Sequence, residues 1–322
     1  MRKKFVALAV IAAGVVLFLN ASRITPKNDE IVVSIKPIHS LVCALTKGIT
    51  HPKLLLDGNF SPHHVRLVPS QIQAMQNARA FIWIGSAYEH PLGNYVKKLE
   101  GKIITIQDSP LIKLKPLRNG LLWDEKAGCN HAHDDDHHHH HHHHHAEGNL
   151  DGHIWLDPMM MVQVVGCVLN DLKSLYPNHH NLLERNAKAY KERLQVLYDD
   201  LLLKMELYKG QTYIIQHDGN QYFDAAFGTQ TIATISIEPG VPPSAGHIMK
   251  IRKAMSIGEI TPRCLFAERQ MEGNLAKSYA STLKLPFAIL DYLAADIPSG
   301  EIAYEQLMHD YITTFIGGIK NH

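Results

Sequence analysis

The sequence predicts an α/β fold of two lobes with mostly parallel sheets, joined by a long rigid linking helix. Short apolar runs alternate with helical segments before residue 108 and again after residue 212, as in parallel sheets. Between these regions an amphipathic pattern runs from Asn181 to Tyr208, and a helix of about 28 residues is about 42 Å long. The 322 residues, 45% of them hydrophobic, are enough for two cores.

These observations divide the chain into an N-terminal lobe over residues 30–178, a linking helix over 179–208 and a C-terminal lobe over 209–322. In the first lobe the expected strands are 31–35, 80–84 and 102–106, and the expected helices are 38–47, 69–77, 91–100 and 158–176. In the second lobe the expected strands are 213–215, 232–237, 263–267 and 287–290, and the expected helices are 220–227, 244–257, 273–283 and 301–316.

Residues 1–21 have the pattern of an export signal. Arg2-Lys3-Lys4 supply the positive start, Phe5 to Leu19 supply the apolar stretch, and Asn20-Ala21-Ser22 supply small residues for cleavage. An uncleaved anchor is the alternative, because Leu19-Asn20-Ala21 is an imperfect cleavage site. No later apolar run is long enough to span a bilayer. We therefore expect a soluble mature chain that is exported to the periplasm.

Composition points toward metal chemistry and away from nucleic acid. The net charge is only +1, so the chain has no basic field for a nucleic-acid partner. It contains 23 histidines, and histidine is the commonest metal ligand. The four cysteines are well separated and form neither a CxxC zinc pattern nor a disulfide framework.

A histidine-rich loop over residues 128–150 interrupts the first lobe. The regular pattern stops from Asp108 to Asp151, which is too long for an ordinary connection. Nine consecutive histidines, His137–His145, follow an acidic run inside the chain, a position unlike that of a purification tag. One interpretation is a solvated tract without a role. We favour a metal-collecting tract, because many imidazoles on one segment give many interchangeable sites.

Four side chains stand at comparable junctions and are the candidate metal ligands. His217 and Asp291 directly follow apolar strands of the second lobe, and ligands of parallel sheets bind beyond the carboxyl ends of strands. His63 and His153 lie in loops of the first lobe, each leading into a helix. A single histidine such as His153, beside the apolar pair Ile154-Trp155, is more often a packed core residue. Its candidacy depends on the other three.

This ligand set predicts capture of Zn²⁺ and not catalysis. Three imidazoles and one carboxylate suit zinc, with bonds of about 2.0–2.2 Å. Four protein ligands leave no position for a water, whereas a catalytic zinc usually keeps three ligands and a water. Closing two lobes on the ion would bind it, and separating them would release it.

The chain resembles the zinc-specific substrate-binding proteins of ABC transporters, of the ZnuA type, in the cluster A-I family that binds bare metal ions. The resemblance covers essentially the whole mature chain. It is carried by Ser61-Pro62-His63 with Leu67-x-Pro69-Ser70, His153 to Pro158, His217-Asp218 with Tyr222-Phe223, Glu238-Pro239-Gly240, Phe266-Ala267-Glu268, and Leu290-Asp291 with Ala295 to Pro298.

The resemblance implies two α/β lobes on a rigid helix, with metal in the cleft between them. It places the ligands at His63, His153, His217 and Asp291, and it implies delivery to the membrane permease of the cognate transporter. We expect the carrier to be a monomer. Manganese relatives have a carboxylate where His217 stands, so the resemblance favours zinc over manganese or another divalent metal. The histidine-rich loop is also typical of zinc members.

Several residues keep more than one interpretation. His64 stands where the family has aspartate and could replace His63 as ligand, although the motif position favours His63. Glu238 and Glu268 are either partners of the ligands in the cleft or structural groups at strand ends. Asp157 is expected to be a helix cap. Three further histidines, His90, His247 and His309, are expected on the surface.

Two other functions compete with the carrier. A zinc hydrolase would use Glu238 or Glu268 as base, but the chain has no HExxH or similar helix motif. A passive zinc buffer would have the histidine-rich loop as its whole function. Deleting residues 131–145 distinguishes these, because a carrier keeps one tight site and a buffer loses its binding.

Overall fold

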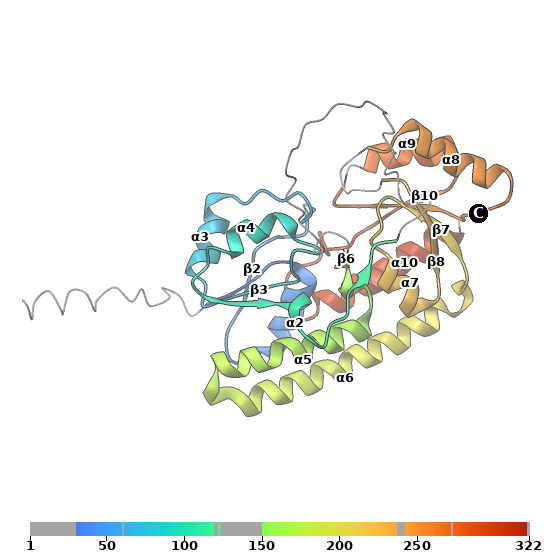
Figure 1. Cartoon of the computed structure of the whole chain (residues 1–322). Coiled ribbons are helices and arrows are strands. Elements are labelled where there is room, and N and C mark those ends of the chain that lie inside the picture. Colours follow the sequence, from blue (N-terminus) through green and yellow to red (C-terminus); the bar gives the residue numbers. More distant parts are fainter. Residues whose placement is uncertain are drawn as a thin grey trace, which may run out of the picture.

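A computed structural model describes residues 30–59, 61–118, 122, 150–236, 242–271 and 273–320 of the chain. It contains two four-stranded sheets in which every pair of neighbouring strands is parallel, and helices pack on both (Figure 1). The predicted two-lobe α/β fold is therefore confirmed. The expected export signal, 1–21, and the histidines of 131–145 lie outside the described residues.

The first sheet has the strand order β2-β1-β3-β4. Its strands are β1 Ile31–Val33, β2 Lys53–Leu54, β3 Ala80–Trp83 and β4 Lys102–Thr105. Its helices are α2 Lys36–Leu45, α3 Pro69–Asn77 and the short α4 Gly93–Val96, which follows a 3-10 turn at His90–Leu92. β1 and β3 are buried along their whole length because helices or loops cover both faces, which is why they consist of apolar residues without alternation.

The second sheet has the order β10-β9-β7-β8. Its strands are β7 Thr212–Ile215, β8 Gln230–Thr234, β9 Leu265–Glu268 and β10 Phe287–Leu290. Its helices are α7 Gln221–Phe227, α8 Ala245–Ser256, α9 Gly273–Leu283 and α10 Ala303–Lys320. α9 packs on β9 and α10 packs on β10. The strand expected over 232–237 begins two residues earlier and ends at Thr234.

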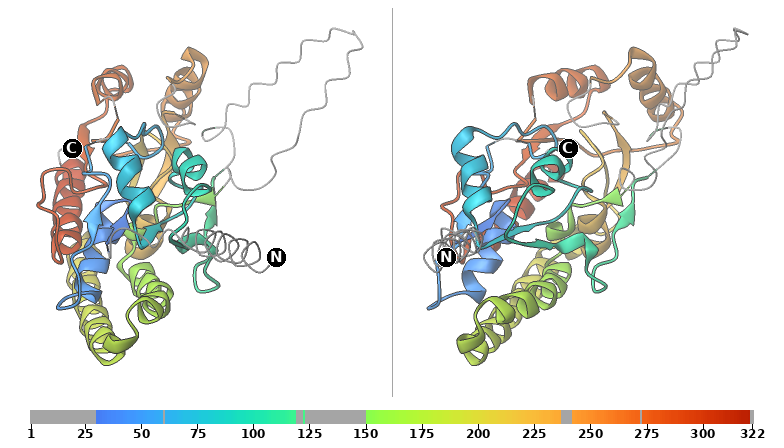
Figure 2. Two further views of the ribbon diagram at one scale, coloured as in Figure 1. Left: turned by 90° about the vertical axis from the view of Figure 1, so that its left-hand side faces the viewer. Right: turned by 60° about the vertical axis from the view of Figure 1, so that its left-hand side comes forward.

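Two long helices, α5 Pro158–Leu175 and α6 His180–Met205, lie side by side along one side of the molecule (Figure 1 and Figure 2). As expected, Asp157 caps α5, because its carboxylate accepts a hydrogen bond from the Met159 N–H. α6 contacts α2 of the first lobe and α7 and α10 of the second. Its buried side chains recur at helical spacing: Leu183, Ala187, Tyr190, Leu194, Leu197 and Leu201.

The two lobes also contact each other directly. The indole Nε1 of Trp155 donates to the Tyr292 carbonyl at 2.9 Å, and the Tyr304 hydroxyl donates to the Trp155 carbonyl at 2.7 Å. Lys36, at the start of α2, donates its ammonium to the Ala294 carbonyl at 2.5 Å. One hydrophobic core accordingly includes residues of both lobes.

The interrupted region of the first lobe, residues 108–151, contains a small antiparallel ladder. In it β5 Lys115–Pro116 pairs with β6 Leu150–Asp151. Within the described ranges, no helix combines the length and apolar character needed to cross a membrane.

Candidate metal centre

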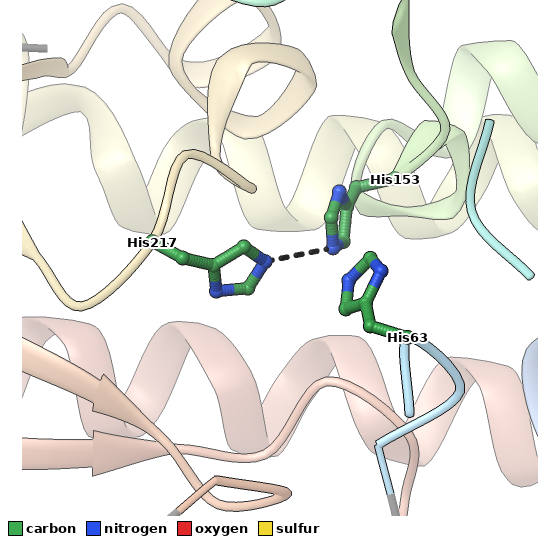
Figure 3. Close-up of side chains that lie close together, drawn as sticks. All are labelled: His63, His153 and His217. Carbon is green, nitrogen blue, oxygen red and sulfur yellow. Dashed lines mark hydrogen bonds between the residues drawn. The ribbon is translucent and has the colours of Figure 1, made fainter. Parts of the chain in front are cut away.

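Three of the predicted ligands come together in one place. The side-chain nitrogens of His63, His153 and His217 that could bind a metal all lie within 4.8 Å of one another (Figure 3). The Nε2 atoms of His153 and His217 are 3.2 Å apart. Two imidazoles on a tetrahedral zinc, with bonds of about 2.0–2.1 Å, would place their nitrogens about 3.3 Å apart. The spacing therefore fits two ligands of one ion.

Each imidazole is delivered by a turn that enters a helix. His63 lies in the loop before α3, His153 begins the 3-10 turn Ile154–Leu156 before α5, and His217 follows β7 and precedes α7. The side chain of His217 lies beyond the carboxyl end of a parallel strand, where the sequence predicted it.

A buried carboxylate orients His153. Oδ1 of Asp151 lies 2.7 Å from Nδ1 of His153 and accepts a hydrogen bond from its backbone N–H at 2.9 Å. With Nδ1 engaged, the ring directs Nε2 toward the other imidazoles. Asp151 is a functional residue that the sequence patterns missed, although its place two residues before a candidate ligand was a usable signal. Gly152 between them has no room for a side chain, because a Cβ would lie 2.6 Å from Cβ of Tyr88.

A second carboxylate orients His217 in the same way. Oε2 of Glu268, at the end of β9, lies 2.9 Å from Nδ1 of His217. Burial alone would lower the pKa of His217, but the Glu268 carboxylate raises it above its usual value. Of the two interpretations of Glu268, the structure supports a partner of the ligand. Glu238, the other carboxylate that the sequence offered as a partner of the ligands, lies outside the described residues.

Of the three imidazoles, that of His63 has the fewest hydrogen-bond partners for its ring nitrogens among the described residues. Burial, then the neighbouring rings of His217 and His153, hold the pKa of His63 well below its usual value, so the ring is neutral at pH 7. Its Nε2 is buried without a hydrogen-bond partner among the described residues. Together with the buried Asp151 and Glu268 side chains, the three imidazoles suit a divalent ion.

Glycine and aromatic rings shape the space around the nitrogens. A Cβ on Gly219 would lie 3.1 Å from Nε2 of both His153 and His217, so this glycine leaves room beside the ligand atoms. The ring of Tyr88 packs edge-on against His63 and His153, with centroids 4.7 Å and 4.8 Å away. The Tyr292 ring packs against His153 at 5.9 Å. These contacts fix the rings and keep bulk water from them.

Asp291, expected to complete the ligand set, does not lie in this cluster. Its Oδ1 accepts hydrogen bonds from Gln270 Nε2 at 2.7 Å and the Leu293 N–H at 2.9 Å, and its Oδ2 accepts one from the Ala295 N–H at 2.7 Å. These donors hold the carboxylate in its own loop and away from the imidazoles. The structure therefore brings together three of the four predicted ligands.

The remaining histidines separate into two groups. His64 is exposed and lines a cleft of about 800 Å³ that also contains Gln216, the residue before His217. His90 is exposed and His309 is half-buried, so both lie at the surface, as predicted. The expected surface position of His247 is wrong: it is buried, with Nε2 2.7 Å from the Thr234 carbonyl. Helical periodicity could not predict this position, because the sequence does not show that a backbone carbonyl would be available to pair with a polar side chain on the buried face of the helix.

Comparison with known proteins identifies the family of the chain. The family model described as zinc-uptake complex component A, periplasmic, matches residues 31–318. A high-affinity zinc uptake system protein ZnuA of Brucella abortus is 34% identical over 315 residues, which cover 90% of this chain and 91% of that protein.

Two solved structures share the fold. A crystal structure of ZnuA has a TM-score of 0.70 at 20% identity and covers 90% of this chain and 99% of its own. The SBP FpvC of Pseudomonas aeruginosa, in complex with Mn²⁺, has a TM-score of 0.72 at 16% identity and covers 90% and 98%. On the family model and the Brucella relative, the chain belongs to the ZnuA family of periplasmic zinc-uptake components.

Proposed function

We propose that this chain is the zinc-binding component of an ABC importer, and that His63, His153 and His217 hold the ion. One observation carries the proposal: three imidazoles converge within 4.8 Å in a buried centre, and two of them are backed by buried carboxylates. Folding alone would not favour this arrangement, because packing the three imidazoles together leaves Nε2 of His63 without a hydrogen-bond partner among the described residues.

The ligand set favours zinc over other divalent ions. Imidazole nitrogen suits zinc, whereas manganese, magnesium and calcium prefer carboxylate, carbonyl and water oxygens. Since a manganese-bound protein shares the fold, the fold cannot decide the metal and the side chains must. A transport protein for manganese or another divalent metal is the weaker alternative.

A zinc hydrolase is the competing function from another class. Its metal would need a carboxylate base beside a bound water. Glu268 contacts Nδ1 of His217, whereas Nε2 of the same ring faces the other imidazoles. The two nitrogens point in different directions, so Glu268 supports a ligand and does not reach a metal-bound water. We therefore propose that the chain is not an enzyme.

The cellular setting follows from the same proposal. The chain would be exported by residues 1–21, work in the periplasm as a monomer and deliver zinc to the membrane permease of its transporter. The export pattern and the periplasmic description of the family support this setting. We propose that the ion enters through the cleft lined by His64 and Gln216, the sequence neighbours of His63 and His217. The division of the chain into an N-terminal lobe that ends at residue 178, a linking helix that ends at residue 208 and a C-terminal lobe is also part of this proposal.

The test compares zinc binding by the full mature chain and by His63→Ala, His153→Ala and His217→Ala. We expect one tight site in the parent and a loss of at least about 100-fold in each variant, beyond the 10–100-fold typical of a residue behind a ligand. His90→Ala, an exposed histidine outside the cluster, is the matched control. Stoichiometry and affinity are measured by metal analysis and chelator competition. Tight binding that survives in all three variants contradicts the proposal.

Two further variants in the same assay address the remaining alternatives. Asp291 stays a proposed fourth ligand on the sequence motif alone, and Asp291→Ala should cost less than any of the three histidines because three N–H donors already hold its carboxylate. Deletion of residues 131–145 should leave one tight site. Loss of all tight binding in that deletion would favour the passive buffer.

A further inference from the structure

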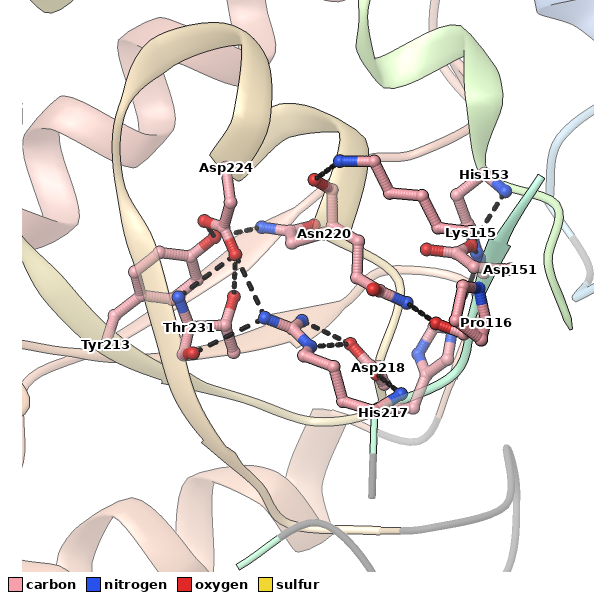
Figure 4. Close-up of polar contacts among 12 residues, drawn as sticks. Lys115, Pro116, Asp151, His153, Tyr213, His217, Asp218, Asn220, Asp224 and Thr231 are labelled. Atoms are coloured by element: carbon pink, nitrogen blue, oxygen red, sulfur yellow. Dashed lines mark hydrogen bonds and ion pairs between the residues drawn. The ribbon is translucent and has the colours of Figure 1, made fainter. Parts of the chain in front are cut away.

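We propose that Arg118 is a positioning residue for the metal centre, because it fixes the segment that carries His217. Arg118 follows β5 and pairs with Asp218, 100 residues later. Asp218 directly follows His217 (Figure 4). The inference rests on the proposed function, since it assigns Arg118 a role in holding a zinc ligand. Neither the sequence patterns nor the ligand cluster identifies this residue.

Arg118 contacts the second lobe through its backbone and its guanidinium. Its backbone N–H donates to Oδ2 of Asp218 at 3.1 Å, its Nε donates to Oδ1 at 2.9 Å, and its Nη2 forms an ion pair with the same oxygen. Nη1 lies 3.3 Å from Oδ2 of Asp224 on α7. Asp224 is itself fixed, because it accepts hydrogen bonds from the Tyr213 hydroxyl at 2.7 Å and the Thr231 hydroxyl at 2.8 Å.

The ladder that carries Arg118 also carries the carboxylate behind His153. Lys115 of β5 pairs with Asp151 of β6. The backbone N–H of Lys115 donates to the Tyr222 hydroxyl at 2.9 Å, and that hydroxyl donates to the Asp151 carbonyl at 2.9 Å. One two-stranded unit therefore supports two of the three imidazoles, His153 through Asp151 and His217 through Arg118 and Asp218.

The Arg118–Asp218 pair is shielded enough to hold its geometry. Its side chains are 23% and 11% exposed. Charge-assisted hydrogen bonds of this forked kind are roughly twice as strong as neutral ones, and removing one partner leaves the other charge uncompensated. Without the guanidinium, the Asp218 carboxylate would turn toward water and move the backbone of His217. Nε2 of His217 would then lose its 3.2 Å spacing from Nε2 of His153.

The expected consequence is faster loss of zinc. Arg118→Met keeps the length of the side chain but has no donors, so we expect zinc to dissociate about tenfold faster, in the range typical of residues behind a metal ligand. Arg118→Lys keeps the charge without the fork and should lie between Met and the parent. Lys102→Met is the matched control, because it removes a lysine from an ion pair with Asp171, 2.9 Å long, in the first lobe.

The experiment uses the full mature chain and two metals. Zinc dissociation is followed by transfer to an excess of a chromogenic chelator, and the absorption spectrum of bound Co²⁺ reports the geometry of the ligands. The melting temperature of each metal-free variant separates positioning from a general loss of stability. Arg118→Met and Asp218→Asn should not add when combined, since both remove the same interaction.

The outcomes decide between the inference and the function on which it rests. Parent-like dissociation and an unchanged Co²⁺ spectrum in Arg118→Met overturn the positioning role. So does a change in dissociation that Lys102→Met reproduces, or that follows the melting temperature with additive effects of Arg118→Met and Asp218→Asn. Failure of the parent chain to bind zinc tightly overturns the proposed function instead.

Discussion

At the residue scale, the two ring nitrogens of His153 have different partners, and so do those of His217. Nδ1 of each lies within 2.9 Å of a buried carboxylate, and Nε2 of each faces the shared centre. This division selects the tautomer with a lone pair on Nε2, which is the form that binds a metal. In the proposed zinc site, affinity would therefore depend on residues that do not touch the ion.

Gly219 is expected to be needed for tight zinc binding, for a steric reason. In Gly219→Ala the new Cβ would lie 3.1 Å from both Nε2 atoms and fill space that the ion and its bonds require. We expect zinc affinity to fall at least about tenfold, as for other changes directly behind a metal site. Chelator competition measures it. In Gly93→Ala, on α4, the added Cβ meets nothing within 4 Å, so this control should bind zinc like the parent. Parent-like binding by Gly219→Ala would show that the space is not needed.

The sequence predicted the three histidines that cluster in the structure but not the residues that support them. His63, His153 and His217 could be predicted because each stands at the end of a recognisable strand or start of a helix. Asp151 and Gly219 act through close approaches between segments that the chain brings together only on folding. The sequence could not show that Asp291 lies outside this cluster in the structure, because a strand end fixes where a residue lies and not which donors bind its side chain. Its role as a fourth ligand stays a proposal.

At the element scale, strand periodicity and capping predicted most boundaries. β10 and α3 have the predicted bounds, since an apolar run and a proline at the helix start are local signals. The helix expected over 91–100 is shorter, with a 3-10 turn followed by α4 at Gly93–Val96. Its few buried positions do not hold a longer helix in place, and short helices are marginal without packing.

The turn after β3 contains a buried acid that should make stability depend on pH. Glu89 is fully buried, and its Oε2 accepts hydrogen bonds from the Ile84 N–H at 2.8 Å and the Gly85 N–H at 3.3 Å. Burial raises the pKa of Glu89 from 4.5 to about 7. Between these values the folded chain holds a proton that the unfolded chain has lost. The free energy of unfolding should therefore fall as pH rises from about 4.5 to about 7, by about 3 kcal/mol, and stay level above.

Glu89→Gln tests this contribution because it keeps an acceptor oxygen and cannot ionise. Denaturant unfolding of both chains, metal-free, at pH 5, 6, 7 and 8 gives the difference in free energy. We expect the variant to gain on the parent between pH 5 and pH 7 and to keep a constant difference above. Parallel pH profiles of the two chains would mean that Glu89 has the same pKa folded and unfolded.

At the scale of the whole molecule, the two lobes pack directly against each other and are not joined by the linking helix alone. The linking helix was predictable from its length and periodicity, and α6 contacts elements of both lobes. The shared core and the interlobe hydrogen bonds of Trp155 were not predictable, because they join residues more than a hundred positions apart. A sequence pattern reports which face of an element is buried and not which partner covers it.

Lys36 is expected to hold the lobes together when no zinc is bound. Its ammonium is buried and donates to the carbonyls of Ala294 at 2.5 Å and Ile297 at 2.8 Å, in the loop that begins at Asp291. Lys36→Met keeps the apolar stem but removes the ammonium donor. The Ala294 carbonyl then keeps only the Ile297 N–H at 3.1 Å and the Ile297 carbonyl loses its bond to Lys36, so water must enter between the lobes to replace the ammonium. The metal-free variant should then show a larger radius of gyration in solution scattering and should open more easily.

Lys47→Met is the control, because Lys47 also joins the two lobes but through an exposed ion pair with Glu301, 2.9 Å long. Exposed pairs contribute roughly 0–1 kcal/mol, so this variant should scatter like the parent. Zinc should draw Lys36→Met back toward the parent radius, since the three imidazoles come from both lobes and bind the ion only when these are together. Equal radii for the metal-free parent, Lys36→Met and Lys47→Met would show that the shared core alone holds the lobes, and that the buried ammonium adds nothing to closure.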